Sequence, residues 1–245
     1  MKSVGINLDK YVEGEIYRGV VTGLNPAFII NGKTREKLMS EDIESNDVIK
    51  PLMIGDDVRK WCIKEKDTYL LYMYHGINIT KLDAVINYLK PYRQKLEARA
   101  TKQKWYELQQ PQMRFSDTFN RPKIVYPEMS QSSRFTLDRT GKFINNKAFI
   151  IPSSDLYLLG VLNSVHIWNY LRITCSPLQG QTFELRSTYM TKVPIPQASE
   201  IERKAISKLV QKCLDAKGID CKAWEKEIDI RVAKLYGFDD NYDLN

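Results

Sequence analysis

The chain has 245 residues, of which 43% are hydrophobic, so it can bury a core in one large domain or two small ones and should not be disordered. Lys and Arg number 37 against 30 Asp and Glu, and the net charge of +7 permits a polyanionic partner such as nucleic acid without establishing one. Four cysteines without a C-x-x-C pair argue against a zinc site. With no signal-peptide pattern and no apolar run of about 20 residues, we expect a cytoplasmic protein with free thiols and no membrane contact.

The first part of the chain predicts a β-hairpin over residues 15–31. Gly19 and Gly23 can adopt backbone conformations closed to other residues, and the turn carries the polar side chains of Thr22 and Asn25. Such a turn can present side chains to a partner, although an ordinary surface turn has the same composition. A short helix over residues 34–38 is expected next, followed by turns around Pro51 and Gly55.

The middle of the chain predicts both strands and helices. Strand-like residues 59–63 and 69–74 flank a charged turn, which predicts a second hairpin. Helices over residues 81–89 and 92–104 should follow, because Pro91 interrupts the helical pattern between them. Three further strands are then expected at residues 121–128, 133–138 and 146–151, the last two being joined by the turn 139–142.

The last third of the chain is mainly helical in pattern. Ser154 or Asp155 should cap a largely buried helix over residues 156–171. A strand at residues 183–188 and an extended proline-containing segment at 193–196 lead into two amphipathic helices, 198–216 and 222–236.

These elements together predict an α+β fold with mixed, mainly antiparallel sheets, packed helices and a C-terminal helical pair. We expect a main domain over residues 1–196 with the helical pair, residues 197–245, packed on it. A single domain over residues 1–245 is the alternative.

No self-sufficient active site is evident. The tetrapeptide Asn25-Pro-Ala-Phe28 is similar to the Asn-Pro-Pro-aromatic motif that holds the target amine in amino-methyltransferases, but no glycine-rich cofactor loop precedes it. Carboxylates near Glu65 or Glu225 could serve a metal nuclease only if they clustered, and both groups have the composition of charged surface. We predict no catalytic, cofactor-binding or metal-binding residue in this chain.

A basic and aromatic composition marks residues 88–139. Arg and Lys side chains outnumber acidic ones there, and aromatic side chains are interleaved with them. Such a surface attracts phosphates and stacks with bases, which favours nucleic-acid binding. A solvated helix face followed by aromatic core strands has the same composition.

Several short segments, in order along the chain, resemble the C-terminal specificity domain of TaqI-type adenine methyltransferases, which also occurs in single-chain restriction-modification enzymes of the Eco57I type. Each segment is short, but the ordered set is fairly specific and extends over nearly the whole chain. The segments are Gly19-Val-Val-Thr-Gly-Leu-Asn-Pro-Ala-Phe28, Ile49-Lys-Pro-Leu-Met-Ile-Gly-Asp-Asp-Val-Arg59, Gln110-Pro-Gln-Met113, Pro122-Lys-Ile-Val-Tyr-Pro127, Tyr157-Leu-Leu-Gly-Val-Leu-Asn-Ser164, Val193-Pro-Ile-Pro196 and Ile228-Asp-Ile-Arg-Val-Ala-Lys-Leu-Tyr-Gly237.

The resemblance implies a target-recognition domain that reads double-stranded DNA in the major groove. In that family a methyltransferase domain flips the target adenine and methylates its N6 amine with S-adenosylmethionine. The catalytic half is missing from this chain, so the resemblance implies a methyltransferase domain or subunit as partner. That partner would hold S-adenosylmethionine, and magnesium if it also carries a nuclease.

Candidate DNA-binding residues follow from the chemistry of base and phosphate recognition. Arg or Lys pairs with guanine and Asn or Gln with adenine, whereas basic side chains in general contact phosphates. The candidates for base reading are Thr22, Asn25, Arg35, Arg114, Arg134, Arg139 and Lys142, and those for phosphate contacts are Lys50, Arg59, Lys102, Lys104 and Lys123.

Two alternatives remain open at this point. One is a divergent methyltransferase or nuclease that uses the Asn25 tetrapeptide or a carboxylate cluster. The other is a protein-interaction module whose terminal helices dock a partner, in which case the basic middle of the chain would be incidental.

Overall fold

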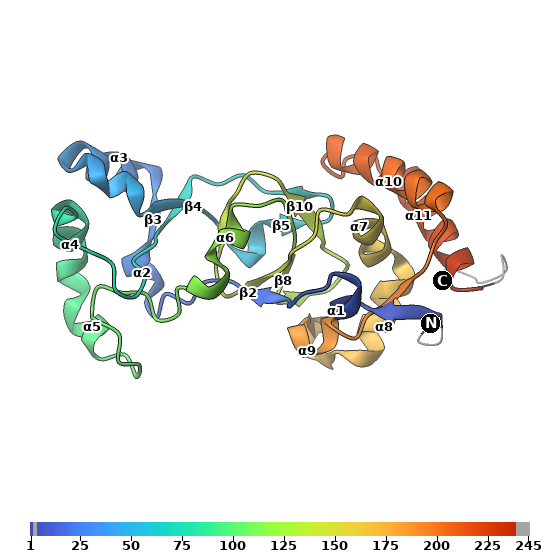
Figure 1. Ribbon diagram of the computed structural model, residues 1–245, viewed down its shortest axis with the longest axis horizontal. Coiled ribbons are helices and arrows are strands. Elements are labelled where there is room, and N and C mark those ends of the chain that lie inside the picture. The colour runs from blue at the N-terminus through green and yellow to red at the C-terminus, as the bar shows by residue number, and fades with distance from the viewer. Residues whose placement is uncertain (2–3, 239–245) are drawn as a thin grey trace.

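Most strands of the computed structural model lie between two groups of helices along the long axis of the molecule (Figure 1). The structure describes Met1 and residues 4–238. The helices are α1 (Leu8–Tyr11), α2 (Asn25–Phe28), α3 (Gly32–Glu41), α4 (Asp83–Leu89), α5 (Arg93–Glu97), α6 (Ser116–Phe119), α7 (Leu156–Asn163), α8 (Val165–Thr174), α9 (Ser187–Met190), α10 (Glu200–Asp215) and α11 (Lys222–Leu235). The strands are β1 (Gly5–Asn7), β2 (Tyr17–Arg18), β3 (Ile29–Asn31), β4 (Ile49–Met53), β5 (Val58–Arg59), β6 (Cys62–Ile63), β7 (Thr68–Leu71), β8 (Lys123–Pro127), β9 (Met129–Ser130), β10 (Thr136–Asp138), β11 (Phe143–Ile144), β12 (Ala148–Ile151), β13 (Ser176–Pro177), β14 (Phe183–Glu184) and β15 (Pro194–Pro196).

The sheets are mainly antiparallel. Two four-stranded sheets have the strand orders β10-β8-β12-β2 and β11-β4-β7-β3, and three smaller sheets pair β1 with β15, β5 with β6, and β14 with β13 and β9. Among these named pairs β11 and β4 are parallel and the others antiparallel. The α+β fold with packed helices is therefore confirmed.

The β10-β8-β12-β2 sheet separates two hydrophobic cores, because successive side chains of a strand point to opposite faces. Ile124 and Tyr126 of β8 face the C-terminal core, which they share with α7, α8, α10 and α11. Val125, between them, faces the arm core, which it shares with the helical arm formed by α3, α4 and α5. All four residues of β12 are buried in the same alternating way.

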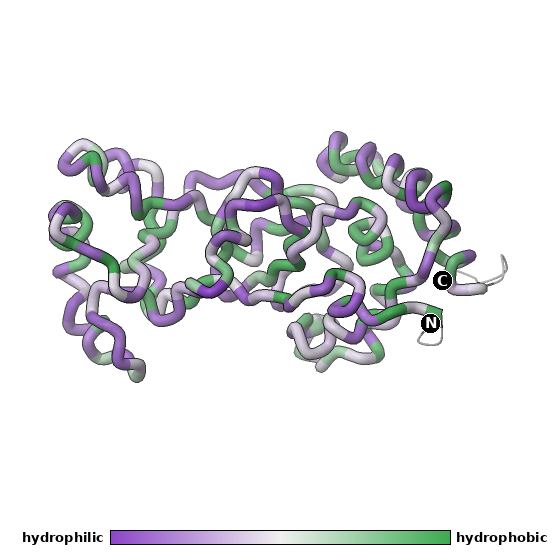
Figure 2. Tube along the Cα trace, in the orientation of Figure 1, coloured by the Kyte–Doolittle hydropathy of each residue, from purple (hydrophilic) through white to green (hydrophobic). Residues whose placement is uncertain are grey.

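The two terminal helices share the C-terminal core with α7. At Gly160 of α7, an added Cβ would lie 2.7 Å from Ile206 Cγ2 and 2.8 Å from Val210 Cγ2, so α10 approaches the backbone of α7 closely. Figure 2 shows α7 as largely hydrophobic, whereas α10 alternates between hydrophilic and hydrophobic residues. The two terminal helices are confirmed at close to their predicted limits. The predicted domain division at residues 196 and 197 stays a prediction.

The opening hairpin prediction is wrong. Its two strands belong to different sheets, since β2 pairs with β12 and β3 pairs with β7. Between them Pro26 lies in the first turn of α2, where its missing N–H costs nothing, and Ala27 and Phe28 are buried in the arm core. Because Ala27 and Phe28 are buried, the segment between β2 and β3 packs into the arm core and does not form an exposed hairpin turn.

The prediction of a second hairpin is also wrong, and so is the prediction that the turn 139–142 joins strands at residues 133–138 and 146–151. β5 turns at once into β6, while β7 pairs with β3 and β4 instead. The turn 139–142 leads from β10 into β11, which pairs with β4, and β10 and β12 lie on opposite sides of β8. In each case a strand finds its partner far along the chain, which local alternation cannot reveal.

The predicted helices at residues 156–171 and 92–104 are shorter than expected. Asp155 caps α7 as predicted, since its Oδ1 accepts the Tyr157 N–H at 2.9 Å. Ser164 then ends α7 and caps α8, with its Oγ donating to Val161 O at 2.7 Å and accepting from Ile167 N at 3.3 Å. α5 ends at Glu97. The predicted strand at 183–188 gives way to α9 after β14.

Across Met1 and residues 4–238, no helix is both long and apolar enough to cross a lipid bilayer.

Candidate nucleic-acid interface

The structure brings Arg59 and Arg134 together in one surface hollow, which we call the basic groove. It has a volume of about 550 Å³ and lies between the β5–β6 turn, the loop before β10, and the loop that joins α10 to α11. Lys60 and Lys217 line it as well, and Trp168 gives it an aromatic wall. The sequence pattern did not identify Lys60 or Lys217, because nothing along the chain indicates that these loops meet.

Trp61 joins the β5–β6 turn to the terminal helices. Its indole N–H donates to Glu225 Oε1 on α11, and Lys60 Nζ lies 2.9 Å from the same oxygen. The α10–α11 loop then passes so close that a Cβ at Gly218 would lie 3.0 Å from Lys60 O. Gly218 also has a left-handed backbone, with φ +78°, so glycine is required there for two reasons. These contacts fix Lys217 beside the groove.

Asn163 fixes the loop that carries Arg134. The buried side-chain amide of Asn163 makes two hydrogen bonds to the backbone of Phe135, the residue that follows Arg134. Its oxygen accepts the Phe135 N–H at 3.1 Å and its nitrogen donates to the Phe135 carbonyl at 2.9 Å. Within the described chain, the Arg134 side chain has no hydrogen bond or ion pair. The groove therefore presents the Arg134 guanidinium with its N–H donors free, on a backbone that Asn163 holds in place.

Asp229 is the acidic side chain among the described residues that line the basic groove. Its Oδ1 accepts the Val165 N–H at 2.9 Å, at the N-terminus of α8. Burial raises the pKa of Asp229, and this outweighs the opposing effects of the Val165 hydrogen bond, Lys60 and His166. The groove is thus mainly basic, with one carboxylate that is costly to ionise.

Arg139 lines a second, smaller hollow that adjoins the basic groove, and so does Glu65, the ion-pair partner of Lys142. The two hollows share Cys62 and Lys217 among their lining residues. Arg139 Nη2 donates to Gln211 Oε1 at 3.0 Å, and Lys142 forms an ion pair with Glu65. Arg139 is therefore an exposed cation near the groove, whereas the Lys142 side chain is 13% exposed and mostly covered by the protein.

Lys123 cannot contact phosphates in this structure, so that prediction is wrong. Its side chain is 0% exposed and forms an ion pair with the equally buried Asp138. The residue follows Pro122 at the start of β8, a strand whose five residues are all buried, so a side chain on either face of it is covered.

Thr22 is also wrong as a DNA contact, because it is 3% exposed. Its hydroxyl donates to Asn25 Oδ1 at 2.7 Å and accepts the Leu24 N–H at 3.2 Å, which shapes the start of α2. Arg99 holds the same turn, with Nη1 donating to Thr22 O at 3.1 Å and Nη2 to Trp105 O at 2.9 Å. Burial lowers the pKa of Arg99. The turn is a structural joint, although Asn25 itself is exposed.

The remaining candidates are spread over other parts of the surface. Arg35 on α3 lies 5.0 Å from the centre of the Tyr69 ring, and Lys50 is half-buried on β4. Lys102 and Lys104 are exposed after α5, with Lys104 Nζ 5.7 Å from the Tyr106 ring centre. Arg114 is exposed and lies 3.4 Å from Glu15. None of these lines the basic groove.

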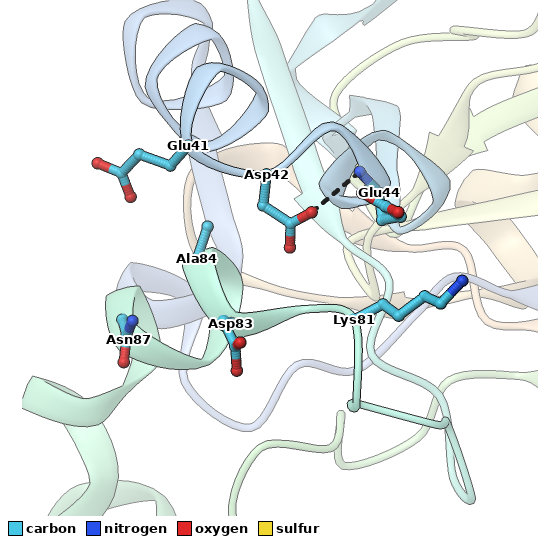
Figure 3. A pocket seen from close by; sticks show the side chains of 7 residues that line it. All are labelled: Glu41, Asp42, Glu44, Lys81, Asp83, Ala84 and Asn87. Carbon is cyan, nitrogen blue, oxygen red and sulfur yellow. Dashed lines mark hydrogen bonds between the residues drawn. The ribbon is translucent and has the colours of Figure 1, made fainter.

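The helical arm carries a hollow of the opposite charge between α3 and α4. Figure 3 shows four carboxylates and a single lysine around this space of about 390 Å³. Like-charged phosphates would be repelled there. The residues with charged side chains are Glu41, Asp42, Glu44, Asp83 and Lys81.

Among the described residues, no three His, Cys, Asp or Glu side chains are arranged to hold a metal ion.

Comparison with known proteins finds one matching family and a solved structure with a similar fold. The family described as the TaqI-like C-terminal specificity domain matches residues 50–195. Among solved structures, the Type IIL restriction-modification enzyme MmeI in complex with DNA superposes with a TM-score of 0.69 at 16% sequence identity. The superposition covers 93% of this chain and 33% of that enzyme, so this chain spans about a third of the length of MmeI. At this identity the likeness concerns the fold.

Proposed function

The chain belongs to the TaqI-like C-terminal specificity domains, and on this premise we propose that it is the DNA target-recognition module of a restriction-modification or DNA-methylation system. A specificity domain selects the site and leaves the chemistry to another domain. The module itself would therefore bind duplex DNA without catalysing a reaction.

The observation that carries this proposal is the pair of free cations in the basic groove. Within the described residues, the side chains of Arg134 and Lys217 have no hydrogen-bonding or ionic partner, although both are held by rigid loops. An arginine fork matches O6 and N7 of guanine, and a lysine suits a phosphate as a point charge. We assign base reading to Arg134 and phosphate contact to Lys217.

Catalysis would come from a methyltransferase domain or subunit outside this chain. That partner would supply S-adenosylmethionine and flip the target adenine, and it would bind magnesium if it also carries a nuclease. Because the partner would close on the DNA from the other side, this chain alone should bind DNA weakly.

Fluorescence anisotropy with mixed-sequence duplexes at two salt concentrations tests DNA binding. The affinity should fall as salt rises, because phosphate contacts release counterions. Lys217→Ala should weaken binding and lower the slope of log affinity against log salt by about 1, the contribution of one phosphate contact. Arg134→Ala should weaken binding and reduce the discrimination between duplexes of different sequence.

Lys81→Ala is the matched control, since this exposed lysine lines the acidic hollow and should not meet DNA. Duplex binding that ignores the salt concentration would count against the proposal. So would an equal effect of Lys81→Ala and Lys217→Ala.

A further inference from the structure

We infer that the buried Lys123–Asp138 ion pair is a positioning device for DNA binding, which holds the turn of residues 139–142 in the conformation that presents Arg139 and Lys142. The inference rests on the proposed function of the module, and it assigns a role to a lysine that does not reach the surface.

The Asp138 carboxylate accepts hydrogen bonds from several groups of the turn 139–142. Oδ1 accepts the backbone N–H of Thr140 at 2.8 Å and its hydroxyl at 2.7 Å, and Oδ2 accepts the backbone N–H of Lys142 at 3.1 Å. Lys123 Nζ donates to Oδ2 at 2.5 Å from the core side. The carboxylate therefore has three donors in the turn and one beneath it.

Lys123 is in turn fixed by the protein beneath the turn. Its Nζ also donates to Phe119 O at 2.6 Å, at the end of α6. Burial lowers the pKa of Lys123, and the charge of Asp138 opposes that effect. Each charge thus makes the burial of the other tolerable.

Stability alone does not account for such a pair. A buried ion pair is often no better for stability than apolar side chains of similar volume, because both charges lose their hydration. An apolar pair could fill this space, but it could not accept the N–H groups of Thr140 and Lys142. The pair therefore supplies something specific to the turn, namely acceptors at its centre.

The shape of the turn decides where its two cations lie. Gly141 has φ +74°, so the chain reverses sharply between Arg139 and Lys142. Arg139 extends to Gln211 on α10, and Lys142 extends to Glu65 in the β6–β7 loop. The Arg139 side chain is exposed, so its hydrogen bond to Gln211 can be exchanged for a phosphate, whereas the Lys142 side chain is 13% exposed and meets the surface at its exposed partner Glu65. The buried anchor remains in place beneath both. The turn is thus ordered before DNA arrives, which lowers the entropy cost of binding.

A double-mutant cycle on the 245-residue chain tests this role by anisotropy with one duplex at fixed salt. The core change is Lys123→Met with Asp138→Leu, and the turn change is Arg139→Ala with Lys142→Ala. Each should lower DNA affinity by about tenfold, the loss expected when one good contact is removed. Because the pair acts through the turn, the chain with all four substitutions should bind no more weakly than the turn change alone.

A second variant and a second measurement keep the test informative if the core change does not fold. Lys123→Met with Asp138→Asn removes both charges but keeps an acceptor for the Thr140 N–H. Amide hydrogen exchange should show faster exchange at Thr140 and Lys142 in either core variant, and less so with asparagine at position 138. DNA affinity should follow the same order.

Three results would overturn the inference. They are unchanged affinity in a folded core variant, fully additive losses in the combined chain, and intact protection of the two turn amides. Failure of the proposed function has a different signature, in which the unaltered, folded chain binds no duplex at all.

Discussion

Basic residues in this chain differ in whether their side chains reach the surface or are buried. Lys217 and Arg134 line the basic groove without partners among the described residues, whereas Lys123 is buried against Asp138. Arg134 and Lys123 lie in the same basic and aromatic segment, residues 88–139, so composition could not separate a surface cation from a buried one. What separates them is the direction in which the backbone points each side chain.

Asp229→Asn tests the cost of the buried carboxylate in the groove. Because burial raises the pKa of Asp229, the folded chain binds this proton more tightly than the unfolded chain does, and ionisation at neutral pH lowers stability. Asparagine keeps an oxygen for the Val165 N–H without the charge, so the substitution should raise the urea midpoint at neutral pH. The gain should shrink as the pH falls towards the ordinary range of an aspartate.

Asp229→Ala is the control for this substitution, since alanine removes the acceptor as well as the charge and should lose the benefit. A lower urea midpoint for Asp229→Asn than for the original chain at neutral pH would contradict the assignment.

At the scale of secondary-structure elements, helix ends and close approaches matter more than helix propensity. The sequence predicts one helix over residues 156–171, yet Ser164 divides it into α7 and α8. This break lets Asn163 reach the backbone of Phe135 and so organise the loop of Arg134. Serine and asparagine favour caps because their side chains bond to nearby backbone groups, but that preference alone does not show which cap is used.

Gly160→Ala tests the packing of α7 against α10. The new Cβ would lie below 3 Å from methyl groups of Ile206 and Val210, so the helices must separate. Overpacking of this kind costs about 1–3 kcal/mol, against a gain of about 1 kcal/mol in helix propensity. We expect a lower midpoint in urea, measured by circular dichroism.

Gly14→Ala is the matched control, because its Cβ would meet the nearest atoms at 3.5 Å and 3.6 Å, an ordinary contact distance. Equal midpoints for Gly160→Ala and Gly14→Ala would mean that α10 can shift at no cost.

At the scale of the whole molecule, one sheet couples the two cores. β8 and β12 contribute alternate side chains to the C-terminal core and to the arm core. Neither core can therefore lose its packing without exposing one face of the shared sheet. The same sheet gives the basic groove and the turn 139–142 a common rigid base.

Ile150→Ala tests this coupling. Ile150 faces the arm core, whereas three of the four tryptophans, Trp61, Trp168 and Trp224, belong to or pack against the C-terminal core. The fourth, Trp105, packs against the arm core, so the test uses a Trp105→Phe background in which fluorescence reports the C-terminal core. The Ile150→Ala substitution should cost about 2–5 kcal/mol. If unfolding is cooperative, tryptophan fluorescence should report the same lowered midpoint as circular dichroism.

Ile43→Ala, at a side chain that is 68% exposed, should leave both midpoints in place. Separate transitions by the two probes in the Ile150→Ala chain would show that the cores unfold independently.

The amino-acid sequence was enough to predict the fold class, the family and those elements whose signals are local. The terminal helices, the cap at Asp155 and the strand β8 depend on periodicity, capping chemistry and flanking prolines, all of which are read within a few residues. The strand pairings, the burial of Lys123 and Thr22, and the proximity of Arg59, Arg134 and Lys217 in one groove became visible only in the folded chain. These depend on contacts between residues far apart in the chain, whose burial and partners no local pattern encodes.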